Sequence, residues 1–222
     1  MNEPLHIIYH DQWLVAVDKP AGHLVHPADH PNENDQVTMK ILRDQIGQQV
    51  FNIHRIDRPT TGVLLFGIDR DVARSLHRSL EKQQVKKLYW AVVHGEPPAE
   101  TWECQQPLRK NDDAPERSAH TTFRTMMRKD TLSLIEAKLH TGRTHQIRKH
   151  LLHAGIPVVG DYRYAGIEIS NQLGKQLGTG TRRLLQSHQL TFNHPITKED
   201  ITITAPVDPC FSQCFPSLLN MA

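Results

Sequence analysis

The sequence is poor in the features that would place it in a membrane or in a disulfide-bonded class of protein. It has three cysteines among 222 residues, an odd number without a framework spacing, so we expect reduced thiols. No apolar run approaches the ~20 residues that span a bilayer. The first residues, MNEPLHIIYHDQW, lack the basic and apolar regions of a secretory signal. We therefore expect a cytoplasmic protein without membrane partners.

Net charge is also scarce. The 26 Lys and Arg residues against 24 Asp and Glu residues leave a formal charge of +2, too little to indicate nucleic-acid binding by itself. Basic residues do gather in two short stretches, and these are Arg55, Arg58, Arg143, Arg148 and Lys149. This clustering favours a basic cleft on a nearly neutral body. The length suits one large domain or two small lobes that share a cleft.

Apolar patterns predict an α+β fold with a mixed, mostly antiparallel sheet flanked by helices. The expected strands are 5–10, 13–18, 63–68, 87–95, 131–139, 188–194 and 200–206. The expected helices are 37–47, a segment that begins at Asp69 or Asp71, and 141–155 with Thr141 or Thr144 as its cap. We expect a polar loop after residue 22 and a surface loop or flexible hairpin over 96–120. No repeat or linker divides the chain, which predicts a single domain over 1–222.

One acid stands out in the stretch HRIDRPTTG, residues 54–62. Asp57 lies between Arg55 and Arg58, in the loop that precedes the predicted central strand. A surface salt bridge is the simple interpretation. The alternative is a reactive carboxylate that faces a polyanion, and the spacing alone leaves both open.

Three further residues have two interpretations each. Arg148 adjoins the apolar stripe of its helix, where it is either an exposed charge or a bidentate partner for a carboxylate. Tyr89 and Trp90 face opposite sides of their strand, so one is expected to be buried while the other faces a cleft. Lys19, at the end of a strand, is either a phosphate contact or a surface lysine.

Several segments together resemble the RluA-type pseudouridine synthase family. HRIDRPTTG is similar to the family signature HRLDxxTSG, and KPAG (19–22) is similar to its first motif. KLYWAVVHG (87–95) resembles the Lys-x-Tyr-x-Ala strand, and LHTGRTHQIRKHLLHAGIPVVGDYRY (139–164) resembles the third motif. RLL (183–185) with LTFNHP (190–195) resembles the closing segment. The motifs occur in family order over about residues 5 to 206.

The resemblance implies a pseudouridine synthase catalytic fold with a central RNA-binding cleft, and it implies a role for each site residue. Asp57 is the catalytic aspartate, Arg148 is its salt-bridge partner, and Tyr89 packs on the target base as a possible general base. Substrate contacts are implied for Arg55, which enters the RNA where the uridine flips out, and for Ile147, Lys19 and Arg143. The reaction is redox-neutral and needs neither a cofactor nor a metal. Departures from the family pattern are Ile56 for Leu, Thr61 for Ser, and Gln186 where many members have His.

The implied partner is structured RNA, and the chain is expected to act as a monomer without an S4-like RNA-binding domain. DQWLVAVDKPAG, RDQIGQQVF and HRIDRPTTGVLL look most like the branch that modifies uridine 65 of tRNA, with ribosomal RNA as the alternative. Two other functions are distant alternatives. One is a metal-dependent hydrolase built on His150 and His153, which are three residues apart on a helix. The other is a non-catalytic RNA chaperone with the same fold.

Overall fold

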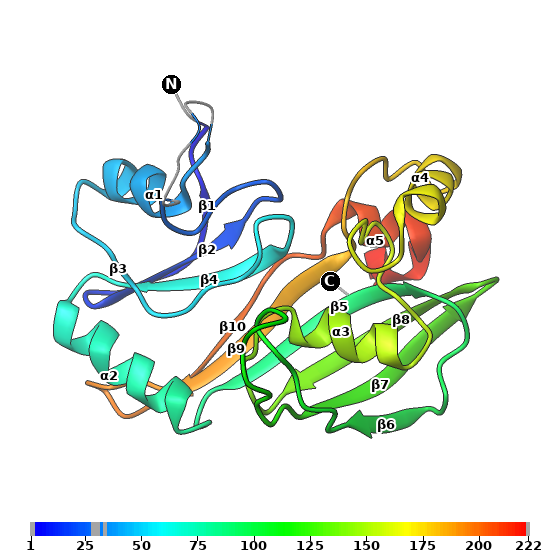
Figure 1. Cartoon of the computed structure of the whole chain (residues 1–222). Coiled ribbons are helices and arrows are strands. Elements are labelled where there is room, and N and C mark those ends of the chain that lie inside the picture. Colours follow the sequence, from blue (N-terminus) through cyan, green and yellow to red (C-terminus); the bar gives the residue numbers. More distant parts are fainter. Residues whose placement is uncertain (1–2, 28–31, 33–34, 221–222) are drawn as a thin grey trace. The chain divides into compact units, whose positions relative to one another are not determined.

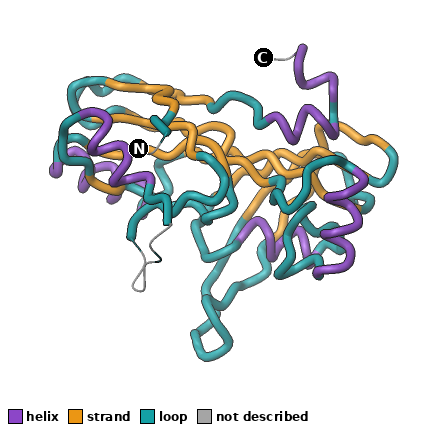
Figure 2. The backbone as a smooth tube through the Cα atoms, turned by 90° about the horizontal axis from the view of Figure 1, so that it is seen from above, coloured by secondary structure: helices purple, strands orange, loops and turns teal. Residues whose placement is uncertain are grey.

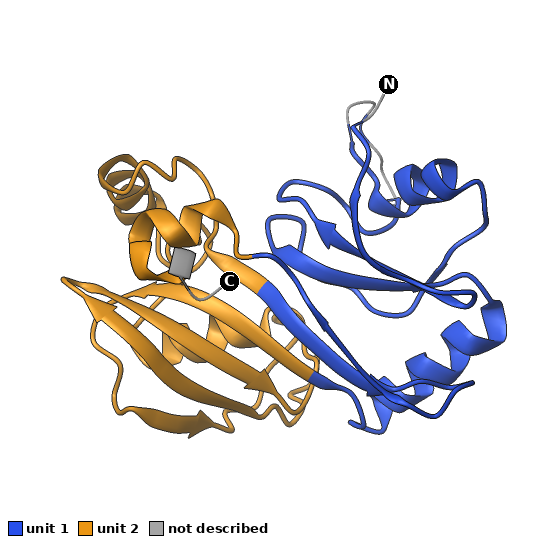
Figure 3. Cartoon of the chain, turned by 180° about the vertical axis from the view of Figure 1, so that it is seen from behind, with its two compact units in different colours: residues 1–86, 187–206 blue, residues 87–186, 207–222 orange. Residues whose placement is uncertain are grey.

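In this computed structural model, residues 3–27, 32 and 35–220 are described, and the chain divides into two compact units (Figure 3). Unit 1 comprises 1–86 and 187–206, and unit 2 comprises 87–186 and 207–222. The chain passes between them at 86/87, 186/187 and 206/207, so no separate linker peptide joins them. Part of the polar loop predicted after residue 22 falls at 28–31 and 33–34, outside the described residues.

Unit 1 contains a small sheet with two helices (Figure 1). Its strands are β1 (His6–His10), β2 (Leu14–Lys19), β3 (Phe51–Asn52), β4 (Thr61–Gly67), most of β9 (Leu185–Asn193) and β10 (Asp200–Thr204). Its helices are α1 (Thr38–Ile46) and α2 (Arg70–Glu81). The order is β1-β2-β4-β9, with β10 paired to β9 and β3 paired to β4.

The core of unit 1 explains why β4 lies centrally. All seven residues of β4 are buried, as expected for a strand that is covered on both faces. Leu65 of β4 packs in one cluster with Leu76 of α2 and Phe192 of β9. Asp69 caps α2 by accepting the N–H groups of Asp71 and Val72, each at 2.9 Å.

Unit 2 is an antiparallel sheet with helices on both faces (Figure 2). Its strands follow the order β5 (Lys86–His94), β8 (Leu132–Leu139), β7 (Thr121–Lys129) and β6 (Thr101–Cys104). Its helices are α3 (Gln146–His153), α4 (Ile167–Gln176), α5 (Pro209–Cys214) and the 3₁₀ segment η1 (Pro216–Asn220).

The two faces of this sheet have different partners. Trp90 and Val92 of β5 pack with Phe211 and Phe215 in one cluster, so α5 covers their face. Thr121 of β7 hydrogen-bonds to α3, and α3 lies on the opposite side of the strands from α5 (Figure 2). The α3 face is therefore the one that carries the functional residues predicted for this unit.

The structure confirms the α+β class, the seven predicted strands and the three predicted helices. No helix in the part of the chain that is described has the length and apolar character to cross a bilayer. Residues 96–120 are not wholly irregular, because 101–104 form β6. Strand β7 and helices α4 and α5 were not predicted. Their patterns are weak, since β7 alternates only over its first half and α4 has exposed Ile167 and Ile169.

Candidate active site

The loop that carries Asp57 runs from the end of β3 to the start of β4. Asp57 is half-buried, and its carbonyl accepts the Thr60 N–H at 3.0 Å, which closes a four-residue turn. Gly62, at the start of β4, has a φ of 100°, a conformation that glycine adopts without steric cost. The carboxylate is thus presented from a tight turn at the entrance to a buried strand.

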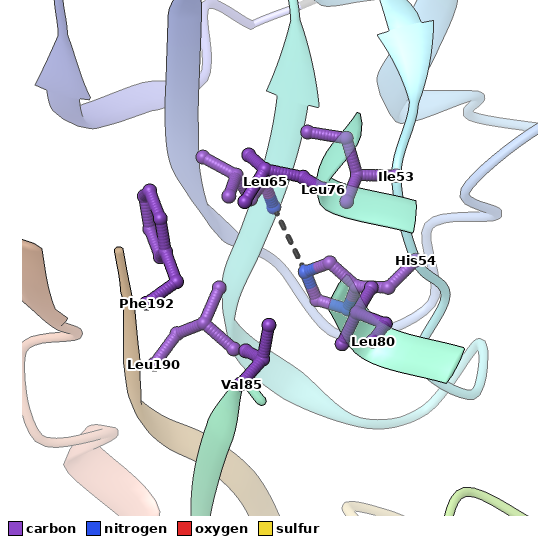
Figure 4. Close-up of a pocket in the computed structure, with 8 residues that line it drawn as sticks. All are labelled: Ile53, His54, Leu65, Leu76, Leu80, Val85, Leu190 and Phe192. Carbon is purple, nitrogen blue, oxygen red and sulfur yellow. Dashed lines mark hydrogen bonds between the residues drawn. The ribbon is translucent and has the colours of Figure 1, made fainter. Parts of the chain in front are cut away.

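His54 anchors the loop on its N-terminal side. Its Nε2 accepts the Leu65 N–H at 3.1 Å (Figure 4), so this nitrogen carries no proton. Strand β3 pairs only with Phe66 and Gly67 of β4. At the next residue of β4, Leu65, the imidazole accepts the N–H in place of a strand carbonyl. The ring lines an apolar pocket together with Ile53, Leu65, Leu76, Leu80, Val85, Leu190 and Phe192 (Figure 4). The pocket is too tight to admit water.

Lys19 and Arg58 anchor the loop on its other side. The Lys19 ammonium donates to the carbonyls of Pro20 (2.6 Å), His23 (3.0 Å) and Arg58 (3.0 Å). The Arg58 carbonyl also accepts the Gly22 N–H at 2.9 Å, while Arg58 Nε donates to the Gly22 carbonyl at 2.8 Å. Residues 19–23 and the Asp57 loop are therefore joined by a network of hydrogen bonds.

These contacts correct one interpretation of Lys19. Lys19 is not a surface lysine, because its exposed fraction is 0%. Its ammonium group bonds to three backbone carbonyls. Arg58, which had no predicted role, also forms an ion pair with Asp35 at 3.0 Å. Arg55 is exposed two residues before Asp57.

These cations also affect a neighbouring histidine. Burial, together with the positive charges of Lys19 and Arg58, lowers the pKa of His23 from its ordinary value. His23 therefore stays neutral at pH 7 and adds no third positive charge beside Lys19 and Arg58.

In unit 2, Tyr89 lies on the α3 face of the sheet. It pairs with Ala137 of β8, and Ala137 pairs with Phe123 of β7, two residues from Thr121. Directly paired residues share a face, so Tyr89 and the α3-bonded Thr121 are on the same side. Tyr89 is 8% exposed and Trp90 is 6% exposed, so the expectation that only one of the two would be buried is wrong.

The sequence predicted Thr141 or Thr144 as the cap of helix α3, but neither residue caps it. It begins at Gln146 after His145, whose φ of 57° is left-handed. The Gln146 side chain organises this entrance, because its Oε1 accepts the Thr141 hydroxyl (2.8 Å) and the Arg143 N–H (2.9 Å). A glutamine inside the helix gives no familiar capping signal, which explains the error.

Two predicted residues on α3 are buried, and the surroundings of one are unexpected. Ile147 is 4% exposed and Arg148 is 2% exposed. Arg148 Nε lies 2.5 Å from Asp161 Oδ2, and its Nη2 donates to Asp161 Oδ1 at 2.9 Å. The exposed-charge interpretation of Arg148 is wrong, and the bidentate grip on a carboxylate is present, with Asp161 as a partner that sequence spacing did not reveal.

Two cationic groups lie near the start of α3. Arg143 is partly exposed, and its Nε donates to the Ser118 carbonyl at 3.0 Å. Burial lowers the pKa of Lys87, which is two residues before Tyr89 on the same face of β5. Lys87 was not predicted as a site residue, although it is the first residue of the Lys-x-Tyr-x-Ala motif.

His150, one of the two histidines proposed for a metal, makes other contacts. His150 is fully buried, with Nδ1 3.0 Å from Thr121 Oγ1 and Nε2 3.1 Å from the Gln106 carbonyl. A metal shared with His153 would have to displace one of these oxygens. Among the described residues, no group of three or more His, Cys, Asp or Glu side chains could hold a metal ion.

Comparison with known proteins gives one consistent result. Residues 13–153, which contain both Asp57 and Arg148, match the family described as RNA pseudouridylate synthase. The chain is 38% identical over 225 residues to tRNA pseudouridine synthase C of Pasteurella multocida, covering 92% of each chain. It is 39% identical to tRNA pseudouridine synthase C of Haemophilus influenzae, covering 94% of this chain and 95% of that one. Human RNA Pseudouridylate Synthase Domain Containing 4 has the same fold, with a TM-score of 0.78 at 23% identity, covering 96% of this chain and 93% of that one.

Proposed function

The chain belongs to the RNA pseudouridylate synthase family, and on that premise we propose that it isomerises a uridine of tRNA to pseudouridine, with Asp57 as the catalytic carboxylate. The observation that carries the proposal is the full-length similarity to proteins named tRNA pseudouridine synthase C. Uridine 65 is the predicted target, from the resemblance of segments 11–22, 43–51 and 54–65. A tRNA substrate also implies action in the cytoplasm.

The reaction places defined demands on the site. The bond between C1′ of ribose and N1 of uracil breaks, the ring turns, and a bond from C1′ to C5 forms while C5 loses a proton and N1 gains one. No electrons are exchanged, so no redox cofactor is required. The base must first leave its stack, which costs a few kcal/mol.

The proposed roles follow from this chemistry. Asp57 acts as an ionised carboxylate, with Arg148 as its ion-pair partner. Tyr89 contacts the uracil and serves as the base for the proton on C5, and Ile147 supplies an apolar wall. Arg55 enters the stack that the uridine leaves. These roles are supported by the exposure of Arg55, the tight turn around Asp57, and the shared sheet face of Tyr89 and α3.

Two positively charged groups have different proposed tasks. Arg143 is partly exposed at the start of α3, and we propose that it contacts the RNA backbone. Lys19 is fully buried and acts through the Asp57 loop instead. RNA binding is expected to weaken as salt concentration rises, because phosphate contacts release counterions.

The test is pseudouridine formation by the purified chain. We expect product in tRNA transcripts, no product with Asp57→Asn, and RNA binding by that variant within about threefold of wild type. Asp71→Asn, an exposed aspartate on α2, is the matched control and should remain active. Product from Asp57→Asn would overturn the carboxylate assignment and favour the RNA chaperone alternative. Product only in ribosomal RNA fragments would replace tRNA by the alternative substrate.

A further inference from the structure

We propose that Asp161 and Tyr164 are positioning residues, which fix the guanidinium of Arg148 in the orientation that the reaction requires. The inference rests on the proposed function, because it assigns Arg148 to the catalytic carboxylate. All of the contacts that support it lie within unit 2, among α3, the turn that follows it and the segment 182–183. Neither residue was singled out in the sequence.

Asp161 determines the plane in which the guanidinium lies. Its two carboxylate oxygens engage Nε (2.5 Å) and Nη2 (2.9 Å) of Arg148, and Asp161 is 0% exposed while Arg148 is 2% exposed. Two parallel hydrogen bonds to a planar group leave it no rotation about the Cδ–Nε bond. The direction in which Nη1 points is therefore set by Asp161.

Tyr164 covers one face of the same group. Its ring centroid lies 4.7 Å from Arg148 Cζ, a cation–π distance. Its hydroxyl lies 3.0 Å from His145 Nδ1, at the residue that precedes α3. The Tyr164 N–H donates to the Asp161 carbonyl at 3.0 Å, so one short turn places both the carboxylate and the ring against Arg148.

The charge of the cluster suits a second carboxylate. Arg183 Nη2 lies 3.6 Å from Asp161 Oδ1, and its side chain is 11% exposed. Two guanidinium groups thus face one carboxylate, and these three groups keep one net positive charge. Asp161 orients Arg148 without cancelling the positive charge that a catalytic aspartate needs nearby.

The backbone around Asp161 is built for this close approach. Gly160 has a φ of 74°, and a Cβ there would lie 1.9 Å from the carbonyl oxygen of Arg182. Only glycine lets the segment 182–183 pass so near. Arg183 can therefore lie beside Asp161 because residue 160 has no side chain.

The test compares Asp161→Asn with Asp208→Asn under single-turnover conditions, on the RNA that the wild-type chain modifies. Asp208 is the matched control, because it is a buried aspartate of the same unit that pairs with Arg182. Both variants are assayed at a temperature where circular dichroism shows complete folding. We expect the rate of Asp161→Asn at saturating RNA to fall at least 100-fold, with half-saturation within threefold of wild type. The control should stay within threefold in both values.

A purely structural role would lower the melting temperature of both variants and leave both rates alike at full folding. Equal rates for the two variants would therefore overturn the role of Asp161. Absence of product from the wild-type chain would instead overturn the proposed function and this inference with it.

A second pair of variants keeps the inference testable if Asp161→Asn does not fold. Tyr164→Phe retains the ring over Arg148 and should react within threefold of wild type. Tyr164→Leu removes the ring and should lose at least tenfold in rate at unchanged half-saturation. Because Tyr164 is partly exposed, both variants are expected to fold. Equal rates for Phe and Leu would overturn the role of Tyr164.

Discussion

Replacing Lys19 by methionine removes a buried ammonium group and keeps most of its aliphatic stem. The ammonium makes three hydrogen bonds to carbonyls, at 2.6, 3.0 and 3.0 Å, and the side chain is 0% exposed. Hydrogen bonds of charged groups contribute about 1.5–3 kcal/mol each, and burying the charge costs several kcal/mol in return. The net loss in the free energy of unfolding is therefore expected to be roughly 2–4 kcal/mol.

The loss should be measured by urea denaturation, with amide hydrogen exchange as the local probe. The Gly22 N–H donates to the Arg58 carbonyl, which the lysine also contacts, so exchange at Gly22 should accelerate in Lys19→Met. Lys40→Met, at an exposed position of α1, is the control and should change stability by no more than about 0.5 kcal/mol.

Activity separates the anchoring role from stability alone. At a temperature where Lys19→Met is fully folded, its rate should still fall, because the lysine joins residues 19–23 to the loop that carries Asp57. A free energy of unfolding of Lys19→Met within about 0.5 kcal/mol of wild type would refute the anchoring role of Lys19. Exchange of the Gly22 N–H at the wild-type rate would refute it as well.

Two further predictions concern histidines of unit 1. His54→Phe should lose about 1–3 kcal/mol of stability in a urea titration, because the Leu65 N–H loses its acceptor. His54→Gln, whose amide oxygen can accept, should lose less. Equal losses for the two variants would contradict the hydrogen bond. Burial lowers the pKa of His188 to about 4 from 6.5, so the unfolded chain binds the proton first as pH falls. The contribution of His188 to stability should therefore be constant above about pH 6.5. It should decline towards pH 4 by roughly 2 kcal/mol, after allowance for the solvated part of the ring, and His188→Gln should lack this component.

Sequence patterns predicted the elements with strong periodicity and the residues with motif resemblance. β4 was recognised because it is a continuous apolar run, and α2 because an aspartate precedes apolar residues spaced by four. β7 was missed because its second half is polar and a bulge between Thr125 and Met127 breaks its alternation. α4 was missed because its buried face is narrow, and two isoleucines at its start are exposed.

The site was predictable only as far as local spacing reaches. Asp57 and Arg148 came from motif resemblance, but Asp161 is 13 residues from Arg148, and no helical or strand period relates them. The buried state of Lys19 was also beyond local reasoning. Its three acceptors include the Arg58 carbonyl, 39 residues away, and lone lysines are rarely fully buried. Long-range contacts that satisfy a buried charge leave no trace in sequence spacing.

The residues of the stretch HRIDRPTTG differ in exposure and in their contacts with the backbone. Arg55 is exposed and Asp57 is half-buried, whereas His54 and Arg58 bond to backbone groups on either side of them. A loop residue can hold a carboxylate in place only if the chain before and after it is fixed, because a free backbone would lose roughly 1–2 kcal/mol of conformational entropy per residue on ordering. The contacts of His54 and Arg58 offset this loss of entropy in the folded protein, before any RNA binds. For this reason the two arginines of the stretch are expected to differ, with Arg55 acting on the substrate and Arg58 acting on the loop.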